Sequence, residues 1–291
     1  MKKVIGVIFA CLFIITAYAQ FRAAPPHNAI LQCFAIGELG ICLACFLPSS
    51  KKAAATSEKL SKSIIPFAVT SLVAVPLTVA AGIYFFGSRK YYFISILIII
   101  EMLIAFFAGF ENRRPKAREI VIISVLSAMA IAGRAAFYFL PQFKPVLAII
   151  IIAGATLGCE TGFITGAITA FVSNFFFGQG PWTPWQMFAM GIIGFIAGII
   201  FRSGLIKPGK VSLSVFGAIS ALVIYGGIMN PSSVIQYQTS PNIQMFITAY
   251  TVALPLDLVH AAATAFFLWF LTDPVTEKIE RVKIKYGIME K

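Results

Sequence analysis

Long apolar runs alternate with short polar segments along most of this sequence. A helix needs roughly 20 apolar residues to cross the hydrocarbon core of a bilayer. The runs therefore predict an all-α integral membrane protein with helices at about 4–20, 28–47, 64–87, 91–110, 120–140, 145–157, 161–177, 185–201, 211–230 and 244–271.

The apolar stretch 145–177 is the least regular part of this pattern, because it is too long for one crossing and short for two. Its polar break is Gly158-Cys159-Glu160-Thr161-Gly162. We predict two short or tilted helices that meet there in a tight turn on the cytoplasmic side.

The first apolar run also resembles a secretory signal peptide. Lys2 and Lys3 precede it, and Ala17-Tyr18-Ala19 resembles a cleavage site. A first membrane helix has the same pattern, and the many later spans favour an uncleaved helix.

Composition and charge agree with lipid as the solvent of this chain. It is 59% hydrophobic and 12% charged, with a mean hydropathy of +0.90, whereas a soluble domain is about half apolar and about a quarter charged. The formal net charge of +12 is explained by orientation, because most Lys and Arg fall in cytoplasmic segments if both termini are inside. We predict a multi-pass protein of the cytoplasmic membrane, surrounded by the lipid bilayer, with no nucleic-acid partner.

The basic stretch ENRRPKARE (111–119) divides the chain. Residues 1–110 form an N-terminal membrane extension of about four helices, to which the sequence assigns no role. Residues 120–285 form a core of six helices, and 286–291 form a C-terminal tail. The same topology places 141–144, 178–184 and 230–242 outside the cell.

Small residues recur every four positions in the core, a spacing that lets helix backbones approach closely in lipid. They serve either internal packing or a docking face for another membrane protein, and spacing alone leaves both open. The stripes are Ser124, Ala128 and Ala132; Gly154, Gly158, Gly162, Gly166 and Ala170; and Gly194 and Gly198.

Ionisable residues inside apolar runs are costly and are usually paired or functional. Arg134 lies about two turns below the outer end of its predicted helix, and Asp257 and His260 share one helix face. Arg134 either pairs with Asp257 or contacts a ligand. Asp257 and His260 could also act as acid–base groups of a membrane enzyme for a lipid or isoprenoid, but neither a Ser nor a Cys nucleophile accompanies them.

Two further motifs carry little chemistry. Cys42-Leu-Ala-Cys45 has neither a second cysteine pair nor a nearby histidine, so buried small residues are favoured over a metal. The segment 204–211 nearly matches a phosphate-binding loop but has Val211 where the magnesium ligand would be. We predict no metal, no cofactor and no ATPase site in the chain itself.

The segment SNFFFGQGPWTPWQM (173–187) interrupts the apolar pattern with glycines, prolines, tryptophans and glutamines. Tryptophans at a membrane boundary are commonly anchors. Glycine and proline together shape a compact backbone, and aromatic faces with a few amides suit a pocket for an organic molecule. Ligand binding is therefore favoured over anchoring alone.

This segment lies within residues 127–198, which resemble the substrate-binding S component of energy-coupling factor (ECF) vitamin transporters. LPLDLVHAAATAFFLWFL (254–271) resembles the last helix of that family, and the similarity extends over about residues 118–285. Typical S components lack the first 110 residues.

The resemblance implies a membrane receptor for a vitamin or related micronutrient. Corrinoids are the first guess, and riboflavin-like, queuosine-precursor or other vitamin ligands are the alternatives. It implies as partners a transmembrane coupling protein and two cytoplasmic ATPases. Ala128 and Ala132 match the family's docking motif. The substrate region beneath the external loops would include Arg134, Phe143, Lys144, Asn174, Gln179, Trp182, Trp185, Gln236 and Tyr237.

Overall fold

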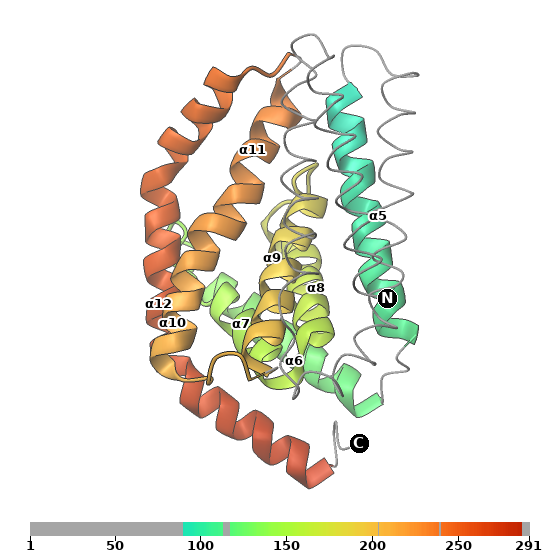
Figure 1. The fold of residues 1–291 in the computed structure, drawn as a ribbon, viewed down its shortest axis with the longest axis vertical. Coiled ribbons are helices and arrows are strands. Elements are labelled where there is room, and N and C mark those ends of the chain that lie inside the picture. Colours follow the sequence, from blue (N-terminus) through green and yellow to red (C-terminus); the bar gives the residue numbers. More distant parts are fainter. Residues whose placement is uncertain (1–89, 113–116, 203, 239, 287–291) are drawn as a thin grey trace. The chain divides into compact units, whose positions relative to one another are not determined.

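The computed structural model describes residues 90–112, 117–202, 204–238 and 240–286, and every regular element within them is a helix. These residues belong to one compact unit, Glu58–Lys291 (Figure 1). The elements are α5 (Lys90–Asn112), α6 (Ala117–Ala136), α7 (Val146–Leu157), α8 (Cys159–Phe177), α9 (Thr183–Ala197), the π-helix η3 (Gly198–Arg202), α10 (Lys210–Ile219), the π-helix η4 (Ser220–Tyr225), α11 (Gly226–Tyr237) and α12 (Ile243–Tyr286).

Each described helix corresponds to a predicted one, and the all-α membrane fold is confirmed. Among the described residues, 117–136, 183–202, 210–237 and 243–285 are long and apolar enough to span a membrane, and 96–108 and 146–157 are shorter apolar helices. The predicted helices 4–20, 28–47 and 64–87 lie outside the described residues.

The core is built around α7, whose Leu147 and Ile150 are completely buried. The predicted break after α7 is confirmed, because α7 ends at Leu157 and α8 begins at Cys159. Gly158, between them, has a φ of +114°, a backbone conformation that favours glycine.

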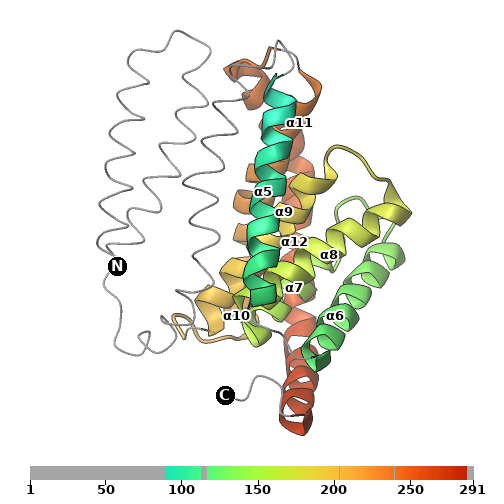
Figure 2. The same ribbon diagram turned by 90° about the vertical axis from the view of Figure 1, so that its right-hand side faces the viewer.

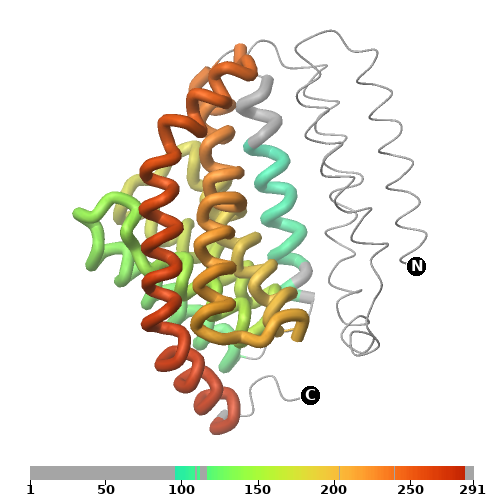
Figure 3. The backbone as a smooth tube through the Cα atoms, turned by 60° about the vertical axis from the view of Figure 1, so that its left-hand side comes forward, coloured from blue at the N-terminus to red at the C-terminus, as the bar shows by residue number. Residues whose placement is uncertain are grey.

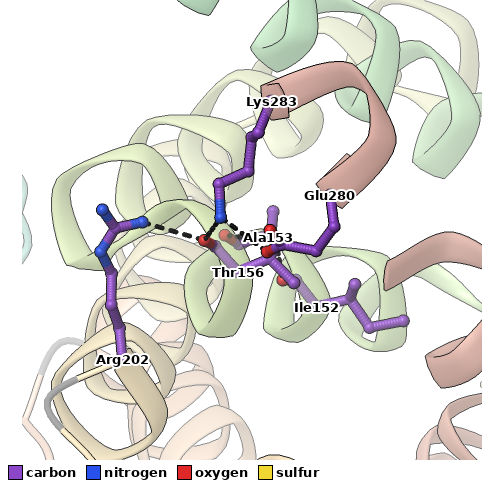
Figure 4. Close-up of polar contacts among 6 residues, drawn as sticks. All are labelled: Ile152, Ala153, Thr156, Arg202, Glu280 and Lys283. Atoms are coloured by element: carbon purple, nitrogen blue, oxygen red, sulfur yellow. Dashed lines mark hydrogen bonds and ion pairs between the residues drawn. The ribbon is translucent and has the colours of Figure 1, made fainter. Parts of the chain in front are cut away.

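The carbonyl end of α7 is covered by two basic side chains (Figure 4). Arg202 Nη1 donates to the carbonyl oxygen of Thr156 at 2.9 Å, and Lys283 Nζ donates to the same oxygen at 3.3 Å. The last carbonyl groups of a helix have no partner within the helix and carry partial negative charge, so cations stabilise them. The contacts join η3 and the end of α12 to α7.

The glycine stripes of α7, α8 and α9 are used for packing inside the protein. A Cβ atom at Gly154 or at Gly162 would overlap with the carbonyl oxygen of Gly194. A Cβ atom at Gly166 would meet the carbonyl oxygen of Met190 at 2.5 Å. These helices therefore pack backbone against backbone, as small residues permit in lipid.

We expect Gly194→Ala to lower the melting temperature of the detergent-solubilised protein, because the new methyl group overlaps with the Gly162 carbonyl group. Overpacking of this kind costs about 1–3 kcal/mol. Gly227→Ala is the matched control, since a Cβ at Gly227 would meet nothing within 4 Å. Equal melting temperatures for the two variants would contradict the close packing.

The helix predicted over 120–140 ends earlier, at Ala136, so Arg134 lies in its last turn rather than two turns below its end. Phe137 to Leu140 form turns instead. Pro141 follows them, and a proline disfavours helical conformation in the residue before it.

The predicted loop 230–242 is mostly helical, because α11 continues to Tyr237 through Pro231. Pro231 has no N–H to donate to the carbonyl group of Gly227, four residues earlier. The hydroxyl of Tyr250 on α12 donates to that carbonyl oxygen at 3.1 Å. Neighbouring helices often satisfy the carbonyl groups freed by proline in this way.

The last helix also extends beyond its predicted end at 271, reaching Tyr286. Lys210, at the start of α10, forms an ion pair with Asp273 at 2.8 Å. Figure 3 shows α12 running beside α10 and α11 and then bending at its lower end. The charged sequence after residue 271 is thus held by contacts with other elements.

Helix α5, which precedes the basic stretch, packs on the core (Figure 2). The ring of Phe106 stacks on Phe163 of α8 with 3.8 Å between centroids and lies edge-on to Phe195 of α9 at 5.0 Å. At least one helix of the N-terminal extension therefore contacts the six-helix core. The remainder of the extension lies outside the described residues.

Candidate functional site

A buried asparagine joins three helices near the ends of α6 and α8. Asn174 is fully buried, and its Oδ1 accepts a hydrogen bond from Arg134 Nη1 at 2.8 Å. Its Nδ2 donates to Thr183 Oγ1 at 3.1 Å and to Gln186 Oε1 at 2.9 Å. Both hydrogens and the oxygen of the amide are thus used, which makes Asn174 the centre of a network.

The network continues across the helices of the core. Gln186 Nε2 donates to the hydroxyl of Tyr225 in η4 at 2.9 Å. The Tyr225 ring meets the imidazole of His260 on α12 edge-on, with 4.8 Å between centroids. We call Arg134, Asn174, Gln186 and Tyr225 the polar chain.

Arg134 is bound by neutral groups only. Its Nη1 also donates to Ser173 Oγ, and its guanidinium lies 4.9 Å from the ring centroid of Phe177. The hypothesis that Arg134 pairs with Asp257 is wrong in this structure, because Asp257 accepts a hydrogen bond from Asn230 at 2.7 Å and forms no ion pair with Arg134. The alternative of ligand contact stays a prediction.

The segment 178–182 forms a short loop above Asn174, and Thr183 fixes it. Thr183 Oγ1 donates to Gln179 Oε1 at 2.8 Å and accepts from the Gly180 N–H at 3.3 Å. Gly178 has a φ of +109°, and a side chain on Gly180 would overlap with the ring of Trp182. The two glycines are therefore required by the backbone turn and by the tryptophan, and Pro184 lies in the first turn of α9.

Lys144 and Phe143 precede α7 and lie beside the polar chain. Lys144 is half-buried, and burial, followed by repulsion from Arg134, lowers its pKa below the usual range. Lys144 also interacts electrostatically with His260. Phe143 packs against Phe267 with 5.2 Å between ring centroids.

Three predicted site residues lie apart from the polar chain. Trp185 packs with the apolar cluster that contains Phe163, and its buried indole Nε1 has no hydrogen-bond partner among the residues that the structure describes. Gln236 and Tyr237 are near the end of α11, and a rise of about 1.5 Å per residue places Gln236 roughly 16 Å beyond Tyr225 along the helix. The predicted residues that this part of the fold brings together are Arg134, Phe143, Lys144, Asn174, Gln179 and Trp182.

Asp257 and His260 do not form an acid–base pair. Asp257 is bonded to Asn230, His260 packs on Tyr225, and no hydrogen bond joins the two side chains. Within the described ranges no group of three His, Cys, Asp or Glu side chains could hold a metal ion, and Cys42 and Cys45 lie outside those ranges.

Sequence reasoning missed four residues of this network: Ser173, Thr183, Gln186 and Tyr225. Thr183 and Gln186 are three residues apart within the segment 173–187, so their shared helix face was a usable signal. A single tyrosine in an apolar helix, such as Tyr225, gives no such signal.

The predicted docking residues lie on an uncovered side of α6. Ala128 and Ala132 are exposed, as is Ser124 one turn earlier, whereas Leu126, Ser127 and Ala130 face the core. This stripe is therefore not buried against the described helices, in contrast to the glycines of α7, α8 and α9.

Comparison with known proteins identifies sequences similar to this chain. The chain is 24% identical to a UPF0397 protein of Vibrio atlanticus over 40% of the chain and 68% of that protein. It is 27% identical to a UPF0397 protein of Aliivibrio fischeri over 38% of the chain and 64% of that protein. A UPF0397 protein of Aliivibrio salmonicida is 30% identical over 28% of the chain and 48% of its own length. No solved structure matches the chain significantly.

The family model described as "ECF transporter, substrate-specific component" matches residues 118–272, which include the polar chain, the loop 178–182 and the exposed stripe of α6. This match covers more than half of the 291 residues. The chain therefore belongs to the substrate-specific components of ECF transporters.

Proposed function

We propose that this protein captures a vitamin or related micronutrient at the end of the helices that carries loops 137–145 and 178–182. This end faces the outside of the cell in the proposed topology, with both termini in the cytoplasm. A corrinoid is the first candidate, and riboflavin-like compounds, queuosine precursors and other vitamins are the alternatives.

One observation carries the assignment of the site. The polar chain links α6, α8, α9 and η4 next to the loop 178–182, in which Gly180 lies against the ring of Trp182. Buried polar groups in a membrane protein are costly and are usually functional. An apolar surface with a few fixed polar groups is what a small-molecule site requires.

The protein would deliver its ligand inward together with a transmembrane coupling protein and two cytoplasmic ATPases. The exposed stripe of Ser124, Ala128 and Ala132 is the proposed contact with the coupling protein. Small residues on a lipid-facing helix allow another helix to approach closely.

The test is mass spectrometry of small molecules that copurify with the detergent-solubilised full chain. We expect a micronutrient with the wild type, and depletion of it by Trp182→Ala and Gln179→Ala, which remove the loop's aromatic cover and its bond to Thr183. Trp269→Ala and Gln244→Ala are matched controls at exposed positions of α12. Undiminished ligand in both loop variants would contradict the site, and a ligand-free wild type in a vitamin-replete culture would contradict the receptor.

A further inference from the structure

Within the function proposed above, on which this step rests, we infer that the ligand carries an anionic group, a carboxylate or a phosphate, that binds to Arg134 and Lys144. Arg134 and Lys144 lie where α6 meets the start of α7, since a Cβ atom on Gly133, beside Arg134, would meet Cγ of Pro145, beside Lys144, at 2.5 Å. No carboxylate of the described residues forms an ion pair with Arg134 or Lys144.

Arg134 is positioned but not neutralised. The bonds from Nη1 to Ser173 and Asn174 fix the guanidinium, and Phe177 lies against it. Its Nη2 and Nε groups make no hydrogen bond to described residues, so donors remain for a ligand. A guanidinium with free N–H groups on adjacent nitrogens matches a carboxylate or phosphate in two-point contact.

Lys144 is the second cation. It is half-buried and makes neither a hydrogen bond nor an ion pair with the described residues. Burial and the nearby Arg134 both disfavour its charged form and lower its pKa. A bound anion would oppose this lowering of the Lys144 pKa, because an opposite charge stabilises the ammonium form.

The acidic residues in the described part of the chain form no ion pair with Arg134 or Lys144. Asp257, the carboxylate on the neighbouring part of α12, is held by Asn230. The ion pairs among the described residues are at the other end of the helices, where Lys210 meets Asp273, Arg281 meets Glu277 and Lys283 meets Glu280. Two uncompensated cations near a membrane are costly, and an anionic ligand removes that cost.

The rings next to the cations indicate an organic anion rather than an inorganic one. Phe177 lies beneath Arg134, and Phe143 precedes Lys144 and packs with Phe266 and Phe267. These surfaces suit an apolar or aromatic body attached to the charged group.

The test uses matched probes with the full chain in detergent at constant ionic strength. Nicotinate, biotin, pantothenate and riboflavin 5′-phosphate are compared with nicotinamide, biotinamide, panthenol and riboflavin, and inorganic phosphate with chloride. Binding raises the melting temperature in proportion to the logarithm of ligand concentration over Kd. We expect inorganic phosphate to stabilise the wild type, and the acid of at least one pair to bind about tenfold or more tighter than its neutral counterpart, as a charge-assisted hydrogen bond predicts.

The variants Arg134→Gln and Lys144→Gln should each remove the preference for the anionic probe. Arg134→Lys and Lys144→Arg should retain it in part, because the charge remains. Lys207→Gln is the control, since it makes the same charge change at an exposed position between η3 and α10.

Three results would overturn the anion site: no stabilisation of the wild type by any anion, equal affinity for both members of the pair that binds, or an unchanged preference in Arg134→Gln and Lys144→Gln. The first two need only the wild type, so a variant that fails to fold does not prevent the test. A neutral vitamin copurifying with the wild type would overturn the anion site and leave the transport function standing. If the protein binds anions but takes up none of the probes in the presence of the ATPase partners, the anion site stands and the transport function is contradicted.

Discussion

Ala128→Trp is expected to abolish ATP-dependent uptake while leaving ligand affinity and melting temperature unchanged. Ala128 is exposed on α6, one turn from the exposed Ala132, and its side chain makes no part of the core. A tryptophan there has space in the isolated protein. It would, however, hold a partner helix away from the backbone of α6, which small residues otherwise allow to approach closely.

The measurement is uptake into proteoliposomes that contain the variant with the coupling protein and both ATPases, beside ligand binding to the variant alone. Ala262→Trp is the matched control, because Ala262 is exposed on α12, away from the proposed contact. Normal uptake with Ala128→Trp would refute docking through this stripe. Loss of uptake in both variants would indicate a general effect of a bulky lipid-facing residue.

The two small-residue patterns show where sequence reasoning stops. Gly162 and Ala128 belong to stripes with the same four-residue spacing, yet Gly162 is buried against the Gly194 backbone and Ala128 is exposed. The four-residue spacing shows that small side chains line one face of a helix. Whether another helix packs on that face depends on where the other helices lie, and the spacing of small residues gives no information about this.

Some helix ends are set by the local sequence and others by contacts with other helices. The break at Gly158 was predictable, because it combines glycine with a polar interruption of an apolar run. The continuation of α11 through Pro231 was not predictable from the sequence, because the carbonyl group that Pro231 leaves free is bound by the hydroxyl of Tyr250 on another helix. The extension of α12 beyond 271 likewise depends on Lys283 reaching Thr156 and on Lys210 reaching Asp273.

Part of the candidate site could be predicted from the sequence. Arg134 and Asn174 are polar residues inside apolar runs, and such residues are uncommon enough in membrane helices to be noticed. Tyr225 is an ordinary residue for an apolar helix, and only its bond to Gln186 reveals its place in the polar chain. The third predicted loop contributed Gln236 and Tyr237 to the hypothesis, and both lie at the end of α11, three turns beyond Tyr225.

Asn174→Asp is expected to keep the fold and to lower affinity for an anionic ligand by about tenfold or more, the size of a lost charge-assisted hydrogen bond. The new carboxylate would lie where Asn174 Oδ1 now accepts from Arg134 at 2.8 Å. It would form an ion pair with Arg134 and compete with the ligand for that charge. The lost donations to Thr183 and Gln186, each worth about 1 kcal/mol, are offset in part by this pair.

Two comparisons separate this effect from simple damage. Asn174→Leu removes the whole amide, so Arg134, Thr183 and Gln186 each lose a hydrogen bond. An unsatisfied buried polar group costs about 1–3 kcal/mol of stability. Asn174→Leu should therefore lower the melting temperature more than Asn174→Asp does. Asn242→Asp adds the same charge at an exposed position, where the side-chain oxygen accepts from the Met245 N–H at 3.0 Å. Ligand affinity should fall in Asn174→Asp and remain at the wild-type value in Asn242→Asp. If Asn174→Asp instead binds the anionic ligand as tightly as the wild type, Arg134 does not hold the anion, because its charge would already be neutralised by the new aspartate.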